Sequence, residues 1–125
     1  MRIGVFGLGE AGSLIAADLV QTGAQVKAYD PADVATPCGV VRYDTPSPVV
    51  VDANVVIALT AAADARRALE QAFEDIPADS VYADFSTAAA SLKRELAAVS
   101  AVRHIGFADV ALLAVVPGNG IRTAA

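Results

Sequence analysis

The sequence has few of the features that mark secreted, membrane or nucleic-acid-binding proteins. Its single cysteine, Cys38, cannot form an internal disulfide, which predicts a reducing, cytoplasmic compartment. Only 9 Lys and Arg residues stand against 14 Asp and Glu, and the net charge of −5 argues against a nucleic acid or an anionic membrane as partner. No apolar run reaches the roughly 18 residues of a membrane span. One basic residue, Arg2, before the first apolar run does not resemble a signal peptide.

Apolar residues, in contrast, make up 55% of the 125-residue chain, against 18% charged residues. Short β-branched runs, typical of buried parallel strands, alternate with segments in which apolar residues recur at helical spacing. We predict strands at 2–6, 25–29, 40–43, 54–59, 80–85 and 103–110, and helices at 10–21, 48–52, 61–76 and 88–99. The alternation predicts an α/β fold of the Rossmann type, a doubly wound parallel sheet in three layers.

Three glycines between the first strand and the first helix have the spacing G-x-G-x-x-G. In this context the first glycine permits a tight turn, the second lets a diphosphate approach the backbone, and the third lets the helix pack on the strand. The free amides and the dipole of the first helical turn then face the anion. We therefore expect a dinucleotide to bind along this loop, with the side chain of Glu10 pointing outward; the residues are Gly7, Leu8, Gly9, Glu10, Ala11 and Gly12.

Asp30 ends the second predicted strand, eighteen residues after Gly12. A carboxylate at this place accepts hydrogen bonds from the hydroxyls of an adenosine ribose and repels a 2′-phosphate. Pro31 and Ala32 follow it, so no arginine stands directly after the acid to receive that phosphate. The sequence thus predicts NAD rather than NADP as cofactor. The alternative is that Asp30 only begins the turn DPAD.

Five segments occur in the order GVFGLGEAGS, VKAYD, NVVIALTAAADA, YADFSTA and GFADVALLA. Together they resemble the N-terminal domain of the β-hydroxyacid dehydrogenases, which include 3-hydroxyisobutyrate dehydrogenase and 6-phosphogluconate dehydrogenase. The resemblance is greatest to the branch of phosphogluconate-dehydrogenase-like NAD-binding proteins. It implies a dinucleotide-binding domain at 1–110 and, at 111–125, the start of a connection to a C-terminal helical domain. The apolar ALLAVV in that last segment also favours a continuation.

The resemblance implies further cofactor contacts. Leu59 and Thr60 match a Leu-Pro pair beside the adenosine and ribose, and Thr87, preceded by Ser86, matches a threonine near the nicotinamide. These residues also follow strands, where open parallel sheets bind ligands. For Ser86 and Thr87 the alternative is a cap at the N-terminus of the next helix.

Three departures from the family pattern concern the substrate and the chemistry. Asp64 stands where the family often has asparagine, and residues 110–114 lack the serine and glycines that hold a substrate carboxylate. The proton-transferring lysine of the family lies beyond the nucleotide-binding domain. The two lysines here, Lys27 in the second strand and Lys93 on the helix after the fifth, do not match it. We therefore assign no catalytic residue within the chain.

Other polar residues carry no separate prediction of chemistry. His104 has no second histidine beside it and is expected at the surface rather than in a metal site. Asp84 and Asp109 lie far apart in the sequence at strand ends and are not interpreted as a catalytic pair. The predicted helix over 61–76 has a solvated face with ion pairs at i,i+3 and i,i+4; its charged residues are Asp64, Arg66, Arg67, Glu70 and Glu74.

Two functions follow from these features. The first is the NAD-binding domain of an oxidoreductase that transfers hydride to or from a small hydroxyacid-like or related substrate, inactive without the helical domain and dimeric in the full-length protein. The second is an NAD-sensing regulatory module, because such modules are also short and place an acid after their second strand. The segments DFSTAAASLKREL and FADVALLA favour the first.

Overall fold

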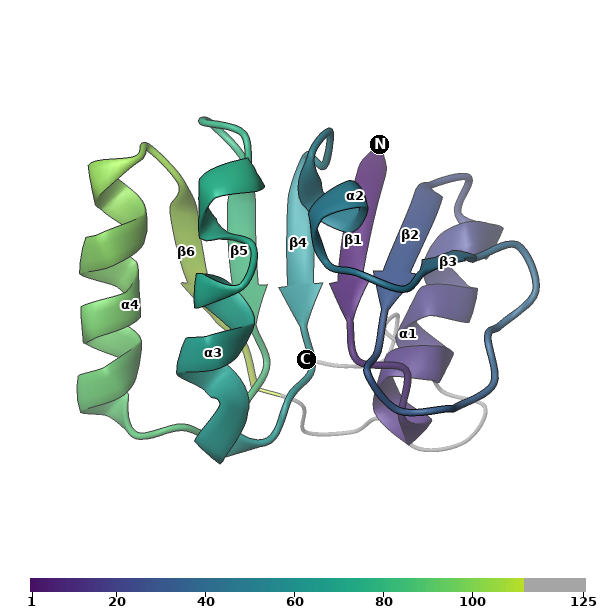
Figure 1. Ribbon diagram of the computed structural model, residues 1–125, viewed down its shortest axis with the longest axis horizontal. Coiled ribbons are helices and arrows are strands. Elements are labelled where there is room, and N and C mark those ends of the chain that lie inside the picture. The colour runs from purple at the N-terminus through teal and green to yellow at the C-terminus, as the bar shows by residue number, and fades with distance from the viewer. Residues whose placement is uncertain (112–125) are drawn as a thin grey trace.

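The structure is a computed structural model that describes residues 1–111. Its six strands form one sheet in the order β3-β2-β1-β4-β5-β6, with every neighbouring pair parallel (Figure 1). This order reverses direction at β1 and β4, as in a doubly wound sheet, and confirms the predicted Rossmann-type fold. The strands are β1 Arg2–Phe6, β2 Gln25–Tyr29, β3 Val41–Tyr43, β4 Val55–Ala58, β5 Val81–Asp84 and β6 Gly106–Asp109.

The connections between strands hold four α-helices and two short 3-10 turns among the described residues. They are α1 Glu10–Gln21, α2 Ser47–Val50, η1 Ala62–Asp64, α3 Ala65–Glu70, η2 Phe73–Asp75 and α4 Ala90–Val102.

The prediction of one continuous helix over 61–76 is wrong. The segment divides into η1, α3 and η2, and the backbone of Ile76 is already extended. The guanidinium of Arg103, which follows α4, donates hydrogen bonds to the carbonyls of Phe73 and Ile76. An arginine 30 residues away from Phe73 in the sequence therefore stabilises the non-helical end of this segment. The sequence around 70–76 contains no local signal for the break.

Helices cover both faces of the sheet and complete the three predicted layers (Figure 1). On one face the buried residues of α2, α3 and α4, among them Val49, Leu69 and Leu96, pack against Phe6, Val56 and Tyr82 of the strands. On the other face Ile15 and Ala16 of α1 pack against Val5 and Ala28. The strands β1, β4 and β5 are therefore shielded on both sides over most of their length, which explains their nearly continuous apolar sequences.

Tyr82 is the largest fully buried side chain of the core, and its hydroxyl has no hydrogen-bond partner in the described part of the chain. Its ring stacks on Phe107, with centroids 6.1 Å apart. Burial, and secondarily the charge of Asp84, raises the pKa of the Tyr82 phenol above its ordinary range. The folded protein therefore holds Tyr82 neutral at a pH where the unfolded chain ionises.

Tyr82→Phe is expected to raise the free energy of unfolding by about 1 kcal/mol at neutral pH, because it removes a buried hydroxyl that has no partner. Above pH ~10 the unfolded tyrosine releases its proton and the folded one does not, so wild-type stability falls as pH rises. The free energy of unfolding of the variant should therefore decrease less over this pH range, because the contribution of Tyr82 to the decrease is absent. Urea unfolding between pH 7 and 11 measures both effects, with Tyr43→Phe on β3 as the control. A clear loss of stability at pH 7 would show that the hydroxyl is satisfied.

Candidate functional site

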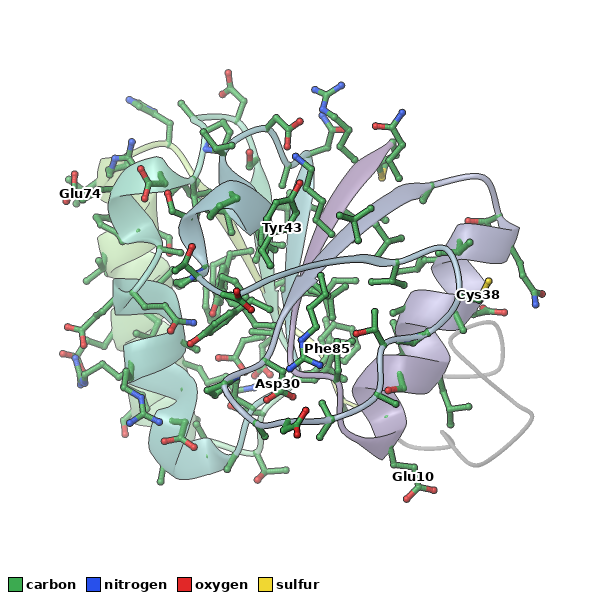
Figure 2. All side chains as sticks on the ribbon, turned by 45° about the vertical axis from the view of Figure 1, so that its right-hand side comes forward. Glu10, Asp30, Cys38, Tyr43, Glu74 and Phe85 are labelled. Carbon is green, nitrogen blue, oxygen red and sulfur yellow. The ribbon has the colours of Figure 1, made fainter. Side chains whose placement is uncertain are left out.

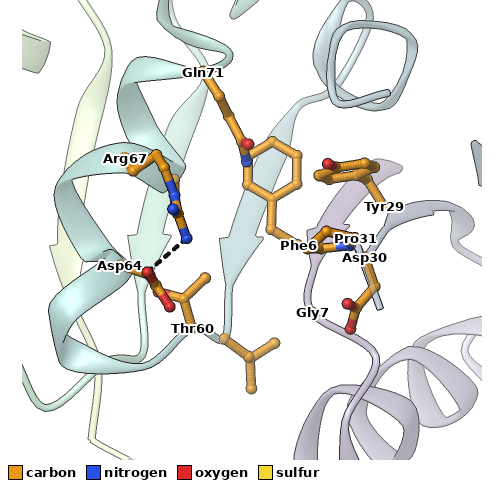
Figure 3. Close-up of a pocket in the computed structure, with 11 residues that line it drawn as sticks. Phe6, Gly7, Tyr29, Asp30, Pro31, Thr60, Asp64, Arg67 and Gln71 are labelled. Carbon is orange, nitrogen blue, oxygen red and sulfur yellow. Dashed lines mark hydrogen bonds and ion pairs between the residues drawn. The ribbon is translucent and has the colours of Figure 1, made fainter. Parts of the chain in front are cut away.

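A cavity of about 460 Å³ opens at the carboxyl ends of β1, β2 and β4 (Figure 3). This is the point where the strand order reverses, and open α/β sheets bind ligands there. Its walls come from segments 6–7, 29–31 and 59–60 and from the region of α3. The lining residues are Phe6, Gly7, Tyr29, Asp30, Pro31, Leu59, Thr60, Asp64, Arg67, Ala68 and Gln71.

Two of the three glycines are required by the fold itself. Gly7 has a φ of +101°, and a Cβ there would lie 2.4 Å from the carbonyl oxygen of Leu59. A Cβ on Gly12 would lie 2.0 Å from the carbonyl oxygen of Gly7. Both obstacles are backbone atoms that cannot rotate away. Gly7 and Gly12 thus allow the turn after β1 and the close packing of α1 on it.

Gly9 is different, because nothing in the fold requires a glycine at this position. A Cβ on Gly9 would meet no atom of residues 1–111 within 4 Å, and its φ of −66° suits any residue. Gly9 is exposed and immediately precedes the first turn of α1, whose amides have no intrahelical partners. The space in front of Gly9 fits a group that binds the bare backbone, such as the diphosphate of a dinucleotide.

The side chains on either side of Gly9 differ in their exposure. Leu8 is buried in the core on the α1 face of the sheet, and Figure 2 shows Glu10 pointing away from the ribbon at the start of α1. Glu10 is exposed, as predicted. Leu8 therefore keeps its side chain out of the space in front of Gly9, and Glu10 extends outward from the first turn of α1.

Asp30 links the loop after β2 to the glycine loop. Its Oδ2 accepts a hydrogen bond from the Leu8 amide at 2.7 Å, and its Oδ1 accepts one from the Ala32 amide at 2.8 Å. The bond from Ala32 agrees with the alternative that Asp30 begins the turn DPAD. The bond from Leu8 shows that Asp30 also holds a segment 22 residues earlier in the sequence. The carboxylate remains half-buried at the cavity wall, and each oxygen has a further lone pair for a ligand hydroxyl.

The sequence prediction missed Arg42 on β3. Its guanidinium donates hydrogen bonds to the carbonyl of Asp30 at 2.9 Å, to that of Ala32 at 2.5 Å, and to that of Val34. An arginine thus does lie beside the loop after Asp30, although none follows it directly in the sequence. Because its donors are directed to backbone carbonyls, Arg42 holds the loop that carries the acid.

The opposite wall of the cavity contains Thr60, Asp64 and Arg67, which face Tyr29 and Asp30 across it (Figure 3). Asp64 and Arg67 form the predicted i,i+3 ion pair, 2.6 Å between Oδ1 and Nη2. The Oγ1 atom of Thr60 is buried and has no hydrogen-bond partner among the described residues. An unsatisfied hydroxyl in a cavity wall is suited to bind a polar group of a ligand.

The neighbouring Arg66 does not pair within its own helix. Its guanidinium instead bonds both carboxylate oxygens of Glu95 on α4, at 2.8 and 3.0 Å. This hydrogen bond is the main cause that lowers the pKa of Glu95. The pair connects α3 to α4 on the surface, and only the Asp64–Arg67 part of the predicted charged face lines the cavity.

Ser86 and Thr87, after β5, lie in different environments. Ser86 is 6% exposed, and its three polar groups are engaged within the protein. Thr87 is exposed and lines a second cavity, of about 470 Å³, at the ends of β5 and β6. Neither side chain caps α4, which begins at Ala90 with Ala89 as its N-cap and has no side-chain cap bond. The capping alternative is therefore wrong, because the turn at Ser86 delays the helix.

The structure brings Asp84 and Asp109 together, although they are 25 positions apart in the sequence. They are register partners on β5 and β6, and the ammonium of Lys93 lies between them, 3.6 Å from Asp84 Oδ1 and 2.5 Å from Asp109 Oδ1. Asp84 and Lys93 are buried, at 0% and 6% exposed, whereas the Asp109 side chain is 61% exposed. An opposite charge therefore separates the two acids.

Residues 1–111 contain neither a metal-binding cluster nor a membrane-spanning helix. No group of three or more His, Cys, Asp or Glu side chains is placed to hold a metal ion there. His104 is exposed at the turn before β6. No helix in the same range combines the length and the apolar character that a bilayer crossing demands.

The strand order, the glycine turn and the acid at the end of β2 define a dinucleotide-binding domain of the Rossmann class. Residues 2–114 match the family model described as the NAD binding domain of 6-phosphogluconate dehydrogenase. The chain belongs to this family, and the resemblance noted in its sequence is confirmed. No curated protein sequence matches it significantly.

Solved structures with the same fold include dehydrogenases and reductases. One is 3-hydroxyisobutyrate dehydrogenase from Mycobacterium tuberculosis with L-serine, at 26% identity and a TM-score of 0.75 over 84% of this chain and 38% of that one. A conserved hypothetical protein from Sinorhizobium meliloti 1021 has 25% identity and a TM-score of 0.80 over 96% of this chain and 44% of that one. An imine reductase from Myxococcus stipitatus in complex with NADP+, at 16% identity, shares the fold with a TM-score of 0.78 over 91% of this chain and 42% of that one. The chain thus spans about two fifths of the length of these proteins.

Proposed function

We propose that this chain is the NAD-binding domain of an oxidoreductase that transfers hydride between the nicotinamide and a small hydroxyacid-like or related substrate. The observation that carries the proposal is Gly9, a glycine that the fold does not need at the point where a diphosphate would meet the backbone. The match over residues 2–114 to a dehydrogenase cofactor domain favours this function over an NAD-sensing module. Hydride acceptance and donation are the chemistry that the cofactor supplies when bound.

Each part of the cofactor has a proposed binding group in the chain. The amides at the start of α1, from Gly9 to Gly12, would hold the diphosphate, and Asp30 would accept hydrogen bonds from the adenosine ribose. Leu59 and Thr60 would lie beside the adenosine, where the Thr60 hydroxyl has no hydrogen-bond partner among residues 1–111. Exposed Thr87 would contact the nicotinamide end. Leu8 contributes indirectly, since its amide bonds Asp30.

The groups that act on the substrate are proposed to come from a helical domain outside residues 1–110, which would also form the homodimer. Residues 112–125, most of the predicted connection to that domain, lie outside the described residues. We propose a cytoplasmic location from the single cysteine. Alone, the cofactor domain would bind nucleotide without turnover.

NAD is proposed over NADP because of the charge on Asp30. A 2′-phosphate about 4 Å from this carboxylate would be repelled by roughly 4 kcal/mol per unit charge at an effective dielectric constant near 20, and by less once salt screens it. Arg42 does not offset this repulsion fully, because its donors already bond the carbonyls of Asp30, Ala32 and Val34.

Calorimetric titration of the 125-residue chain with NADH and NADPH tests the proposal. We expect NADH to bind at least about tenfold more tightly than NADPH, and Asp30→Asn to reduce this preference by weakening NADH and strengthening NADPH. Asp33→Asn is the matched control, since it removes the same charge from an exposed position of the same loop. Tighter NADPH binding by the wild type would refute the cofactor assignment, and no binding of either would refute the function.

A further inference from the structure

Lys93 is a buried cation that the proposed function has not used. It lies on α4, and its ammonium donates hydrogen bonds to the carbonyl of Ser86 at 2.7 Å, to Oδ1 of Asp109 at 2.5 Å and to the carbonyl of Asp84 at 3.4 Å. An ammonium has three N–H donors. Each of the three therefore has an acceptor on a different part of the chain: the end of β5, the segment after it, and the end of β6.

This arrangement indicates a tether rather than an acid–base group. All three donors of Lys93 are engaged inside the protein, and the buried carboxylate of Asp84 supplies a compensating charge 3.6 Å from the ammonium. A proton on this nitrogen has no free path to a ligand unless one of these bonds breaks. The same bonds fix the positions of the segments that they join.

The segment held most directly is Ser86–Thr87. The Ser86 carbonyl that accepts the bond from Lys93 belongs to the peptide unit joining these two residues. The Ser86 amide donates to Asp84 Oδ1 at 2.7 Å, and its hydroxyl accepts from the Ala88 amide at 3.3 Å. With Ser86 fixed on all sides, exposed Thr87 is presented to the cavity that Lys93 and Asp109 also line.

We propose that Lys93 is a positioning residue for the nicotinamide end of the site, acting through the Ser86 carbonyl to orient Thr87. This inference rests on the proposed function, because it assigns one half of the cofactor to this cavity. The adenosine half would bind at the separate cavity beside Asp30, whose walls include neither Lys93 nor Thr87. Loss of Lys93 should therefore affect the two halves of the cofactor unequally.

The test compares NADH with ADP-ribose, which contains the diphosphate and both riboses and lacks the nicotinamide. Calorimetry is performed on the 125-residue chain with the wild type, Lys93→Met and the double variant Lys93→Met/Asp84→Asn. The double variant removes both buried charges, and Asn retains an acceptor for the Ser86 amide, so it keeps the test valid if the single variant unfolds. We expect roughly tenfold weaker NADH binding in the variants, with ADP-ribose affinity unchanged within about twofold.

Lys27→Met is the matched control, since it removes the only other lysine of the chain, one that pairs with exposed Asp52. This variant should bind both ligands as the wild type does. Equal losses for NADH and ADP-ribose in the folded Lys93 variants would overturn the inference, as would no loss for either, and the proposed function would stand. A wild type that binds neither ligand would overturn both.

Discussion

Gly12→Ala is expected to destabilise the protein severely, whereas Gly9→Ala should leave it folded and remove most of its affinity for the cofactor. At Gly12 the new methyl group would be built 2.0 Å from the carbonyl oxygen of Gly7 and 2.8 Å from the carbon of the same group. Relief requires α1 to move away from β1, which disrupts the core around Ile15 and Ala16. The cost should be about 3 kcal/mol or more, a large part of a typical domain's stability.

At Gly9 the same methyl group would lie more than 4 Å from every atom in the described part of the chain outside its own neighbours. The backbone is already in a conformation common to all residues, so the free energy of unfolding should change by no more than about 1 kcal/mol. The methyl group would occupy the volume through which a diphosphate approaches the amides of α1. NADH affinity should fall by roughly tenfold or more, which is about 1.4 kcal/mol.

Urea unfolding followed by circular dichroism, together with NADH calorimetry, separates these two effects. The two variants serve as each other's control, because the chemical change is identical and the positions are three residues apart. Wild-type NADH binding by folded Gly9→Ala would place the diphosphate elsewhere. A stable Gly12→Ala protein would show that α1 can shift without loss of the core.

Lys93→Met is expected to lower the free energy of unfolding by about 3–5 kcal/mol, because it leaves the charge of Asp84 buried without its partner. Asp84 is fully buried, and its Oδ2 has no hydrogen-bond partner among the described residues. Asp109 cannot compensate, since it carries the same negative charge. The loss arises from the uncompensated carboxylate more than from the three hydrogen bonds.

Adding Asp84→Asn to Lys93→Met should therefore recover much of the lost stability, because the double variant buries no charge. Urea unfolding of the wild type, both single variants and the double variant forms a double-mutant cycle that measures the coupling. Asp109→Asn is the control, since this carboxylate is largely exposed and its removal should cost about 1 kcal/mol or less. Additive losses in the cycle would mean that Asp84 and Lys93 do not form a compensating pair.

Much of the fold could be predicted because its signals are local. The bounds of β1, α1 and β2 agree with the predicted 2–6, 10–21 and 25–29. In that part of the chain apolar periodicity, Gly23 after the helix and the glycine turn all favour the same structure. The prediction of a helix over 61–76 failed where local and distant interactions conflict, since the guanidinium of Arg103 donates hydrogen bonds to the carbonyls of Phe73 and Ile76 at the end of this segment.

Part of the candidate site could also be predicted from the sequence. The glycine spacing and Asp30 carry a known chemical rationale within about thirty residues, and the structure places them around one cavity or beside it. The roles of Arg42 and Lys93 could not be predicted from the sequence. Their partners lie 7 to 16 positions away, on other strands or loops, and no residue pattern marks such pairings.

The sequence by itself determined the alternation of strands and helices, the parallel Rossmann-type sheet, the glycine turn with its acid, and the family. These features depend on short-range periodicity and on backbone conformation, which neighbouring residues specify. Only the tertiary structure distinguished Gly9 from the glycines that packing requires, separated buried Ser86 from exposed Thr87, and joined Asp84 to Asp109 through Lys93. Such distinctions depend on which atoms meet when β5, β6 and α4 pack together, because burial makes each charge and each hydrogen-bond partner count far more than in water.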